Sequence, residues 1–328
     1  MAVARNIIDQ LVSIADVSVR EGVPLAEHTR FAIGGPAAVF AEAATERALA
    51  DALHVIKATG APYTVIGEGS NLIVSDDGFD GIVLRFTARD IARTDDSVRA
   101  DAGATLQTLV DYAIAQGLRG LETMTGIPGS VGAAVYGNAG AYGHSIHERV
   151  SEVRFLDRNT IRSFNRAECQ FRYRESVFKE RKSWIILSVD LDLTPAPSAE
   201  LRATADEILK IRLAKYPTTM KCAGSIFKNL LIADLPESVR TQIPERVVRE
   251  GKVPSAYFLE QAGAKGLRNG GVEVAEYHAN LIYNTGAGTA AQLRELIDDL
   301  KARVRAQFAI ELEEEVQYVG FAPSAVLS

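Results

Sequence analysis

The segment that most constrains the fold of this chain covers residues 126–142. It contains five glycines and four alanines and carries no charged residue. A backbone with so few side chains can lie very close to another group, and glycine reaches positive φ without steric cost. Exposed backbone N–H groups in such a loop suit a phosphate. A tightly packed strand and turn in an ordinary core is the alternative, and this segment alone does not decide between the two.

A second glycine-rich loop lies upstream, at residues 67–71. It follows the apolar, β-branched residues 63–66, which read as a strand with Pro62 at its entry. The loop, Gly-Glu-Gly-Ser-Asn, offers backbone N–H groups, a hydroxyl and an amide to a pyrophosphate. It lacks the third glycine and the opening helix of a Rossmann fingerprint, because strand-like residues 72–74 come next. Two such loops favour a large phosphate-bearing cofactor.

Composition narrows the function classes. The 328 residues are 47% hydrophobic and carry a net charge of −6, so no basic stripe is present to bind nucleic acid. No apolar run reaches membrane-spanning length, and no signal sequence precedes the chain, so we expect a cytoplasmic protein. Cys169 and Cys222 cannot form a disulfide framework. The five histidines are scattered without ligand spacing, so no metal site is expected.

Apolar periodicity and capping residues predict an α+β fold rather than a regular βαβ repeat. Helices are predicted over residues 6–14, 45–57, 105–116, 255–261 and 289–308. Further strands are predicted over residues 81–86, 98–104, 184–193, 272–274 and 280–283, with a hairpin at 150–164 and one interrupted strand at 310–319.

The best domain boundary is the Pro-Ala-Pro-Ser sequence at residues 195–198, because it ends a strand and starts a helix. We therefore expect a first region over residues 1–197 and a second domain over residues 198–328. Within the first region, two α+β subdomains are expected at about residues 1–86 and 87–197.

Polar groups stand at three places where an ordinary core would not favour them. On a predicted strand through residues 171–178, Arg172 and Arg174 share one face, and an arginine fork matches a carboxylate. An exposed edge with a salt bridge is the alternative.

The second place is Ser225, which follows Gly224 at a turn with no nearby histidine. A proton-donor role therefore fits better than acyl transfer, and an ordinary turn serine is the alternative.

The third place is the acidic run at residues 311–315. Four acids in five positions are typical of a solvated face. Glu315 directly opens an apolar strand, where one carboxylate could point inward. The pattern does not choose among the four acids.

Several of these motifs together resemble one family, the UDP-N-acetylenolpyruvoylglucosamine reductases, which are flavoproteins of bacterial peptidoglycan synthesis. The matching stretches keep the family's order and cover nearly the whole chain: residues 29–35, 67–72, 126–133, 138–143, 173–178, 223–229, 278–280 and 315–316. The short spacing between Arg174 and Trp184 resembles the family's shorter subtype, which lacks an extra substrate-capping loop. Leu230 stands where the family usually has proline.

The resemblance implies an FAD-binding domain of the vanillyl-alcohol-oxidase (PCMH) type, followed by an α+β substrate-binding domain whose C-terminal strand returns to the flavin site. It also implies non-covalently bound FAD and NADPH as the hydride-donating co-substrate. The expected reaction is reduction of UDP-N-acetylglucosamine enolpyruvate to UDP-N-acetylmuramate in the cytoplasm. No nucleic-acid or membrane partner is expected. We expect a monomer, with a weak dimer as the alternative.

The resemblance also assigns roles to single residues. Arg174 corresponds to the arginine that binds the substrate carboxylate, Ser225 to the proton donor and Glu315 to the catalytic glutamate. The implied substrate-binding residues are Tyr173, Lys228, Asn229 and Asn280. The implied cofactor-binding residues are Gly67, Gly69, Ser70, Asn71, Gly126, Pro128, Gly129, Ser130, Gly132, Ala133, Asn138 and Gly140.

Two other functions stay open at this point. One is an FAD-dependent oxidase of the same fold that acts on an alcohol or a sugar. Such enzymes often attach flavin covalently through a histidine, and neither glycine-rich loop contains one. The other is a catalytically silent nucleotide-binding module, against which the joint presence of Arg174, Ser225 and Glu315 argues.

Overall fold

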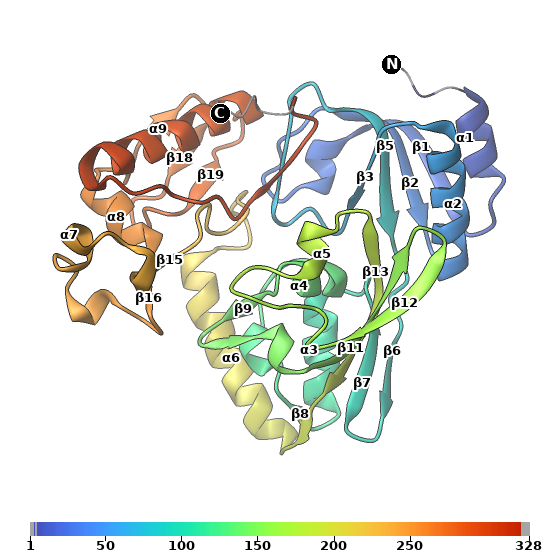
Figure 1. Ribbon diagram of the computed structural model, residues 1–328, viewed down its shortest axis with the longest axis horizontal. Coiled ribbons are helices and arrows are strands. Elements are labelled where there is room, and N and C mark those ends of the chain that lie inside the picture. The colour runs from blue at the N-terminus through green and yellow to red at the C-terminus, as the bar shows by residue number, and fades with distance from the viewer. Residues whose placement is uncertain (1–2, 4, 323–328) are drawn as a thin grey trace. The chain divides into compact units, whose positions relative to one another are not determined.

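The computed structural model describes residue 3 and residues 5–322, and the chain forms two compact units (Figure 1). Unit 1 comprises the described residues up to Val23 together with Ala37–Gly69 and Asp80–Pro217. Unit 2 comprises Pro24–Pro36, Ser70–Phe79 and the described residues from Thr218 onward. Unit 2 therefore includes two short N-terminal segments. The functional division predicted at residues 197 and 198 stays a prediction.

Unit 1 contains a mixed four-stranded sheet with strand order β1-β2-β5-β3, in which β3 and β5 run parallel. Its strands are β1 (Val17–Pro24), β2 (Pro36–Ala43), β3 (Tyr63–Ile66) and β5 (Phe79–Phe86). Helices α1 (Arg5–Val12) and α2 (Glu46–Thr59) pack against each other beside this sheet, in the blue part of Figure 1. Their apolar faces, including Ile8, Leu49 and Leu53, are buried, as their helical spacing requires.

A second, five-stranded antiparallel sheet of unit 1 has the order β12-β11-β13-β7-β6. Its strands are β6 (Ile91–Thr94), β7 (Ser97–Asp101), β11 (Val150–Asp157), β12 (Thr160–Asn165) and β13 (Trp184–Asp192). The helices of this part are α3 (Leu106–Ala115), α4 (Val131–Tyr136), α5 (Val177–Glu180) and α6 (Ser198–Lys215). Two-residue strand pairs link β8 (Leu118–Arg119) with β14 (Thr194–Pro195), and β9 (Gly140–Ala141) with β10 (His144–Ser145). One hydrophobic cluster runs through both sheets.

Unit 2 is built around a small antiparallel sheet, β17-β18-β19, and the long helix α9 (Ala290–Phe308). Its other helices are α7 (Glu237–Arg240) and α8 (Ser255–Gln261). Its strands are β4 (Leu72–Val74), β15 (Leu230–Leu231), β16 (Lys252–Val253), β17 (Arg268–Asn269), β18 (Val272–Val274), β19 (Ile282–Asn284) and β20 (Gln317–Val319). Short 3-10 turns span Leu25–His28, Glu122–Met124, Ile146–Glu148, Ile232–Asp234 and Glu245–Val247.

The N-terminal segments of unit 2 are held by hydrogen bonds to its C-terminal part. The Asp76 carboxylate accepts bonds from the N–H groups of Ala290 (2.8 Å) and Ala291 (2.9 Å), at the start of α9. The Asn284 amide donates to the Phe31 carbonyl at 3.0 Å. Because a helix start leaves backbone N–H groups without partners, a carboxylate there stabilises α9.

The predicted starts of the helices at residues 45, 105 and 289 are confirmed. The Thr45 hydroxyl accepts from the N–H of Ala48 at the start of α2, and Thr105 accepts from Thr108 at the start of α3. Thr289 and Gln292 form a capping box on α9. The hairpin at β11–β12 is also confirmed, with a turn of two residues between the paired Asp157 and Thr160.

The strand predicted through residues 171–178 is wrong. Arg172 and Glu175 exchange backbone hydrogen bonds of 3.0 and 3.1 Å, so the chain reverses within four residues. Arg174 stands in this turn with φ = 58°, and α5 follows. Arg172 and Arg174 therefore do not share a strand face. The alternation of residue types matched a strand, but the local backbone forms a turn instead.

Two further expectations need correction. The interrupted strand at residues 310–319 is reduced to β20, because residues 313–315 bond to a different segment, residues 226–228. The glycine-rich segment 126–142 is neither all loop nor a strand and turn, since its middle forms the helix α4. The Ser130 hydroxyl caps this helix by accepting from the N–H of Ala133 at 3.3 Å.

The close backbone contact at Gly78 gives a stability prediction. Gly60 and Gly78 have similar φ values, 68° and 78°, but a Cβ on Gly60 meets nothing within 4 Å. A Cβ on Gly78 overlaps the Pro36 carbonyl oxygen and lies 2.6 Å from its nitrogen. We expect Gly60→Ala to lower the free energy of unfolding by about 1 kcal/mol, and Gly78→Ala by about 2 kcal/mol more. Urea unfolding of both variants measures this. If both variants lose the same free energy of unfolding, the close contact between Gly78 and Pro36 is contradicted.

Candidate active site

The two glycine-rich loops of unit 1 lie against each other. A Cβ placed on Gly67 comes within 2.7 Å of the Ser130 hydroxyl and 3.5 Å of the Ala133 Cβ. Gly67 directly follows β3, and Ser130 directly precedes α4. The missing side chain at Gly67 therefore allows the loop after β3 to contact the start of α4.

Glycine in the second loop also brings α4 close to the five-stranded sheet. Gly132 donates its N–H to the Ala102 carbonyl at 2.9 Å, and a Cβ there would lie 2.8 Å from the Ala102 Cβ. Gly126 has φ = 76° and donates to the Gln107 side chain at 2.7 Å. Pro128, between these two, is exposed. Close packing thus accounts for two of the glycines predicted to bind a cofactor.

Both loops leave backbone donors available. Within residues 3 and 5–322, the N–H groups of Gly67, Glu68, Gly69, Gly129 and Ser130 donate no hydrogen bond to backbone or side chain. Gly69 and Ser130 are buried, where an unpaired N–H is costly. Five such donors on two adjoining loops fit the diphosphate of a dinucleotide such as FAD. Ser70 and Asn71, which continue the first loop, belong to unit 2.

The second half of the glycine-rich segment positions Arg174. The carbonyl oxygen of Gly140 accepts a hydrogen bond of 2.9 Å from the Arg174 guanidinium. Asn138, with φ = 42° and 3% exposure, donates through its amide to the Arg172 carbonyl at 2.8 Å. Asn138 therefore fixes the start of the turn that carries Arg174.

The two arginines of this turn have different partners. Arg172 forms an exposed ion pair with Glu180 at 2.6 Å. The Arg174 guanidinium lies over the Tyr173 ring, 5.3 Å from its centroid, and the Lys179 ammonium donates to the Arg174 carbonyl at 2.8 Å. Arg174 is thus a half-buried, permanently charged group held at its backbone and at its guanidinium.

In unit 2, backbone hydrogen bonds bring the segments of Ser225 and Glu315 together. The Glu315 N–H donates to the Ile226 carbonyl at 2.7 Å, and the Lys228 N–H donates to the Glu313 carbonyl at 2.9 Å. On its other side, Ser225 pairs with Leu281. Residues 225–228 are therefore the middle one of three adjoining segments, and Ser225 and Glu315 are both half-buried there.

Glu311, Glu313 and Glu314 of the acidic run each form an ion pair with a basic side chain. Glu311 pairs with Arg305, whose guanidinium lowers the pKa of the Glu311 carboxyl below its usual value. Glu313, with an exposed side chain, pairs with Lys228. Glu314 pairs with Lys301 at 2.7 Å and accepts from the Tyr318 hydroxyl. Burial, together with this Glu314 carboxylate, raises the pKa of Tyr318.

The buried Asn280 amide holds residues 225–228 in place. The Asn280 amide donates to the Phe227 carbonyl at 2.9 Å and to the Ser255 hydroxyl at 2.7 Å, and its oxygen accepts from the Phe227 N–H at 2.9 Å. Asn280 is 3% exposed. Its side chain thus fixes the backbone between Ser225 and Lys228.

Two contacts of this site could not be foreseen from the sequence. The Asn71 amide donates to the Glu315 carbonyl at 2.9 Å, across 244 positions of the chain. The fully buried Ser255 accepts the Asn280 bond, and its N–H donates to the Asn229 side chain at 3.4 Å. No spacing rule relates residues so far apart. Leu230, which stands where the family usually has proline, lies in β15 and pairs with Val253. The chain after Asn229 is therefore a short strand.

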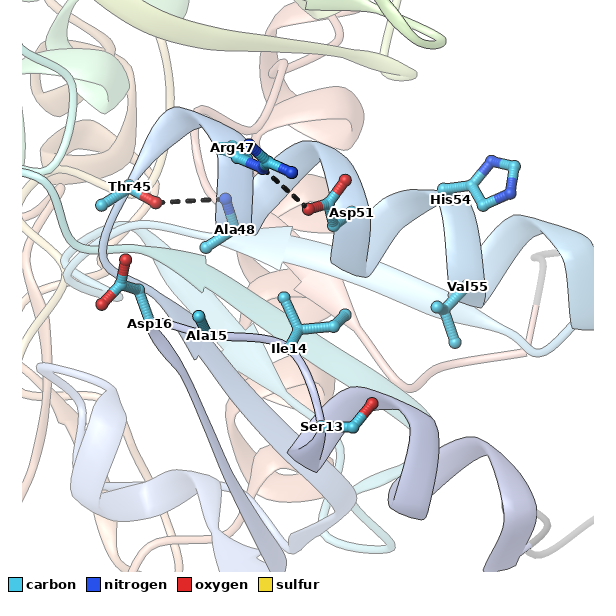
Figure 2. A pocket seen from close by; sticks show the side chains of 10 residues that line it. All are labelled: Ser13, Ile14, Ala15, Asp16, Thr45, Arg47, Ala48, Asp51, His54 and Val55. Carbon is cyan, nitrogen blue, oxygen red and sulfur yellow. Dashed lines mark hydrogen bonds and ion pairs between the residues drawn. The ribbon is translucent and has the colours of Figure 1, made fainter.

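A cavity of about 580 Å³ between the end of α1 and the face of α2 contains none of these residues (Figure 2). Figure 2 shows two local interactions in its lining: Arg47 pairs with Asp51 at 3.6 Å, and Thr45 caps α2. We assign it no ligand.

No helix among the described residues has both the length and the apolar character needed to cross a membrane. In the same part of the chain, no group of three or more His, Cys, Asp or Glu side chains is placed to hold a metal ion.

Two adjoining loops with available backbone donors, on an α+β scaffold, define a dinucleotide-binding protein, and comparison with known proteins specifies the class as one with an FAD-binding domain. Residues 36–160 match the family described as FAD binding domain. Residues 216–319 match the C-terminal domain of UDP-N-acetylenolpyruvoylglucosamine reductase. The chain belongs to the UDP-N-acetylenolpyruvoylglucosamine reductase family.

Full-length relatives agree with this assignment. The chain is 56% identical to the UDP-N-acetylenolpyruvoylglucosamine reductase of Solibacter usitatus, over 95% of this chain and 100% of that protein. It is 35% identical to the enzyme of the same name from Carboxydothermus hydrogenoformans, over 95% and 97% of the two chains. The crystal structure of UDP-N-acetylenolpyruvylglucosamine reductase from Thermus caldophilus superimposes with a TM-score of 0.72 at 29% identity, covering 92% of this chain and 98% of that one.

The contact between the loops predicts a cofactor-binding defect. Gly67→Ala introduces a methyl group against Ser130, which separates the two loops, so we expect FAD to bind about tenfold more weakly. Gly137→Ala is the matched control, because a Cβ there meets only the Ala133 carbonyl at 3.5 Å. Fluorescence of flavin released on dilution gives the dissociation constant. Equal affinities of the two variants contradict the proposed role of this contact.

Proposed function

We propose that this chain reduces the enolpyruvyl ether of UDP-N-acetylglucosamine enolpyruvate to the lactyl ether of UDP-N-acetylmuramate, with NADPH as hydride donor. The observation that carries the proposal is the 56% identity with a reductase of that name over its full length. The adjoining loops with available N–H groups support non-covalent binding of FAD. FAD, when bound, supplies the hydride that it has taken from NADPH.

Unit 1 supplies the cofactor site and the carboxylate anchor in this proposal. The N–H groups of Gly67, Gly69, Gly129 and Ser130 are the donors available to the FAD diphosphate. The other cofactor residues proposed are Gly126, Pro128, Gly132, Ala133, Asn138 and Gly140 in unit 1, and Ser70 and Asn71 in unit 2.

Arg174 binds the substrate carboxylate, on which negative charge accumulates as the double bond is reduced. A guanidinium keeps its charge at every working pH and stabilises that charge without reorganising. Its bond to the Gly140 carbonyl and its packing on Tyr173 fix it before substrate arrives. Tyr173 contributes to the same substrate subsite.

Unit 2 supplies the proton. Ser225 donates its hydroxyl proton to the carbon next to the one that receives hydride. A serine hydroxyl is a weak acid, so its surroundings must stabilise the alkoxide. Glu315 assists the carboxylate end of the substrate. Lys228 and Asn229 bind the diphosphate, while Asn280 acts as a positioning residue through Phe227.

Finer features follow from the same reading. We infer the shorter subtype, because the chain passes from Arg174 through the one-turn helix α5 directly into β13 at Trp184. Residues 1–197 would bind FAD and residues 198–328 the substrate. Parallel pairing of β20 with β4 in unit 2 places the C-terminal strand beside the residues that follow Asn71. A cytoplasmic monomer completes the proposal.

Ser225→Ala tests the proton-donor role. We expect NADPH to reduce the flavin within about twofold of the wild-type rate, because that half-reaction does not use Ser225. Reoxidation by the enolpyruvyl substrate should slow by about 100-fold or more. Rapid mixing without oxygen, followed by flavin absorbance, measures both. Ser225→Thr keeps a hydroxyl and should recover part of the rate. If both half-reactions slow equally in Ser225→Ala, Ser225 is not the proton donor.

Glu315→Gln tests the choice among the four acids. We expect reoxidation by substrate to slow by about tenfold or more, because the substitution removes the carboxyl group proposed to assist at the carboxylate end of the substrate. Glu311→Gln is the matched control: it makes the same carboxyl-to-amide change at an exposed residue paired with Arg305. The measurement is again the reoxidation half-reaction. If Glu311→Gln slows it as much as Glu315→Gln does, the assignment fails.

A further inference from the structure

A second cavity of unit 1, about 550 Å³, lies at the tip of the β11–β12 hairpin. Guanidinium groups from three chain segments line it: Arg158 in the hairpin turn, Arg162 on β12 and Arg181 just after α5. We call it the arginine pocket. None of the residues assigned above to cofactor or substrate lines it.

The pocket is positively charged in a chain with a net charge of −6. Asp157 is the acidic residue of the lining and pairs with Arg162 at 3.1 Å. Arg158 and Arg181 make no ion pair with any residue that the structure describes. Arginine keeps its charge, so Arg158 and Arg181 leave the cavity with an excess of two positive charges, which attracts an anion.

Trp184 forms the floor of the pocket and orients two of the guanidinium groups. The Cζ atoms of Arg162 and Arg181 each lie 5.9 Å from the indole centroid. The indole in turn packs on Phe155, with ring centroids 4.8 Å apart, and on Phe164 at 5.5 Å. Cation–π contact with a ring fixed in an aromatic cluster preorganises both arginines, which lowers the cost of binding a ligand.

The hairpin turn gives an independent indication. Arg158 has φ = 58°, a left-handed conformation that favours glycine or asparagine in two-residue hairpin turns. Turn geometry therefore does not account for an arginine here. Strain of this kind clusters at active sites and ligand clamps.

We propose that the arginine pocket binds the phosphoryl groups of a diphosphate-class anion. Guanidinium forks match phosphate oxygens in pairs, and a diphosphate offers enough oxygens and charge for the forks of Arg158 and Arg181. The hydroxyls of Thr160 and Ser183 supply two more donors at the rim. Because Asp157 already pairs with Arg162, a single carboxylate would still leave one guanidinium group unneutralised. The proposal does not rest on the reductase function.

Trp184 is the only tryptophan in the sequence, so its emission reports directly on this pocket. Inorganic pyrophosphate is titrated into the full-chain flavoprotein with selective tryptophan excitation. We expect a saturable change in emission, because a bound anion alters the positions of Arg162 and Arg181 over the indole. Unchanged emission up to millimolar pyrophosphate would overturn the proposal. A parallel titration with uridine diphosphate shows whether a nucleotide or the free anion is the better source of the diphosphate.

Paired variants separate this site from general charge effects. Arg158→Ala with Arg181→Ala should weaken pyrophosphate binding tenfold or more, while the two lysine replacements should restore part of the affinity. The control pair Arg5→Ala with Arg47→Ala removes the same charge from exposed residues of unit 1 and should stay within twofold of wild type. Flavin content and the urea midpoint verify folding. Equal weakening in both pairs would show attraction by net charge alone and overturn the proposal.

Discussion

The proposed chemistry depends on the pairing of residues 225–228 with residues 313–315. Two backbone hydrogen bonds, Glu315 to Ile226 and Lys228 to Glu313, set the register between these segments. A slip of one residue would place a different acid beside Ile226 and move every side chain to the opposite face. Asn280 and Asn71 hold the two segments from either side, through the Phe227 and Glu315 backbones. The position of the glutamate is thus set by backbone contacts, with side-chain amides in support.

Local features of the fold were predictable because their causes are local. Thr45, Thr105 and Thr289 cap their helices as their sequence contexts indicate, and alternation with a turn predicts the β11–β12 hairpin. The α+β class and the glycine-rich loops follow from the same kind of pattern. What the pattern did not show is that Gly67 lies against Ser130, because contact between loops depends on how β3 and α4 pack in unit 1.

The turn that carries Arg174 shows where local reasoning fails. Alternating residue types from 171 to 178 suggested a strand, yet Arg172 and Glu175 bond to each other and Arg174 adopts positive φ. Its anchors, the Gly140 carbonyl and Asn138, lie more than thirty positions away. The family motif singles out Arg174, whereas the conformation of this residue depends on tertiary contacts. The same applies to Asn280, whose motif position did not reveal a saturated, buried amide.

Unit 1 offers two different chemistries for phosphate. The glycine-rich loops present backbone N–H groups, which carry only partial charge and suit a ligand that packs closely against the chain. The arginine pocket presents full charges on side chains, held by an aromatic floor and open to solvent. Binding at the pocket must weaken with added salt, because its charges are exposed, whereas buried N–H donors are screened much less. Salt dependence therefore distinguishes an anion at the pocket from one at the loops.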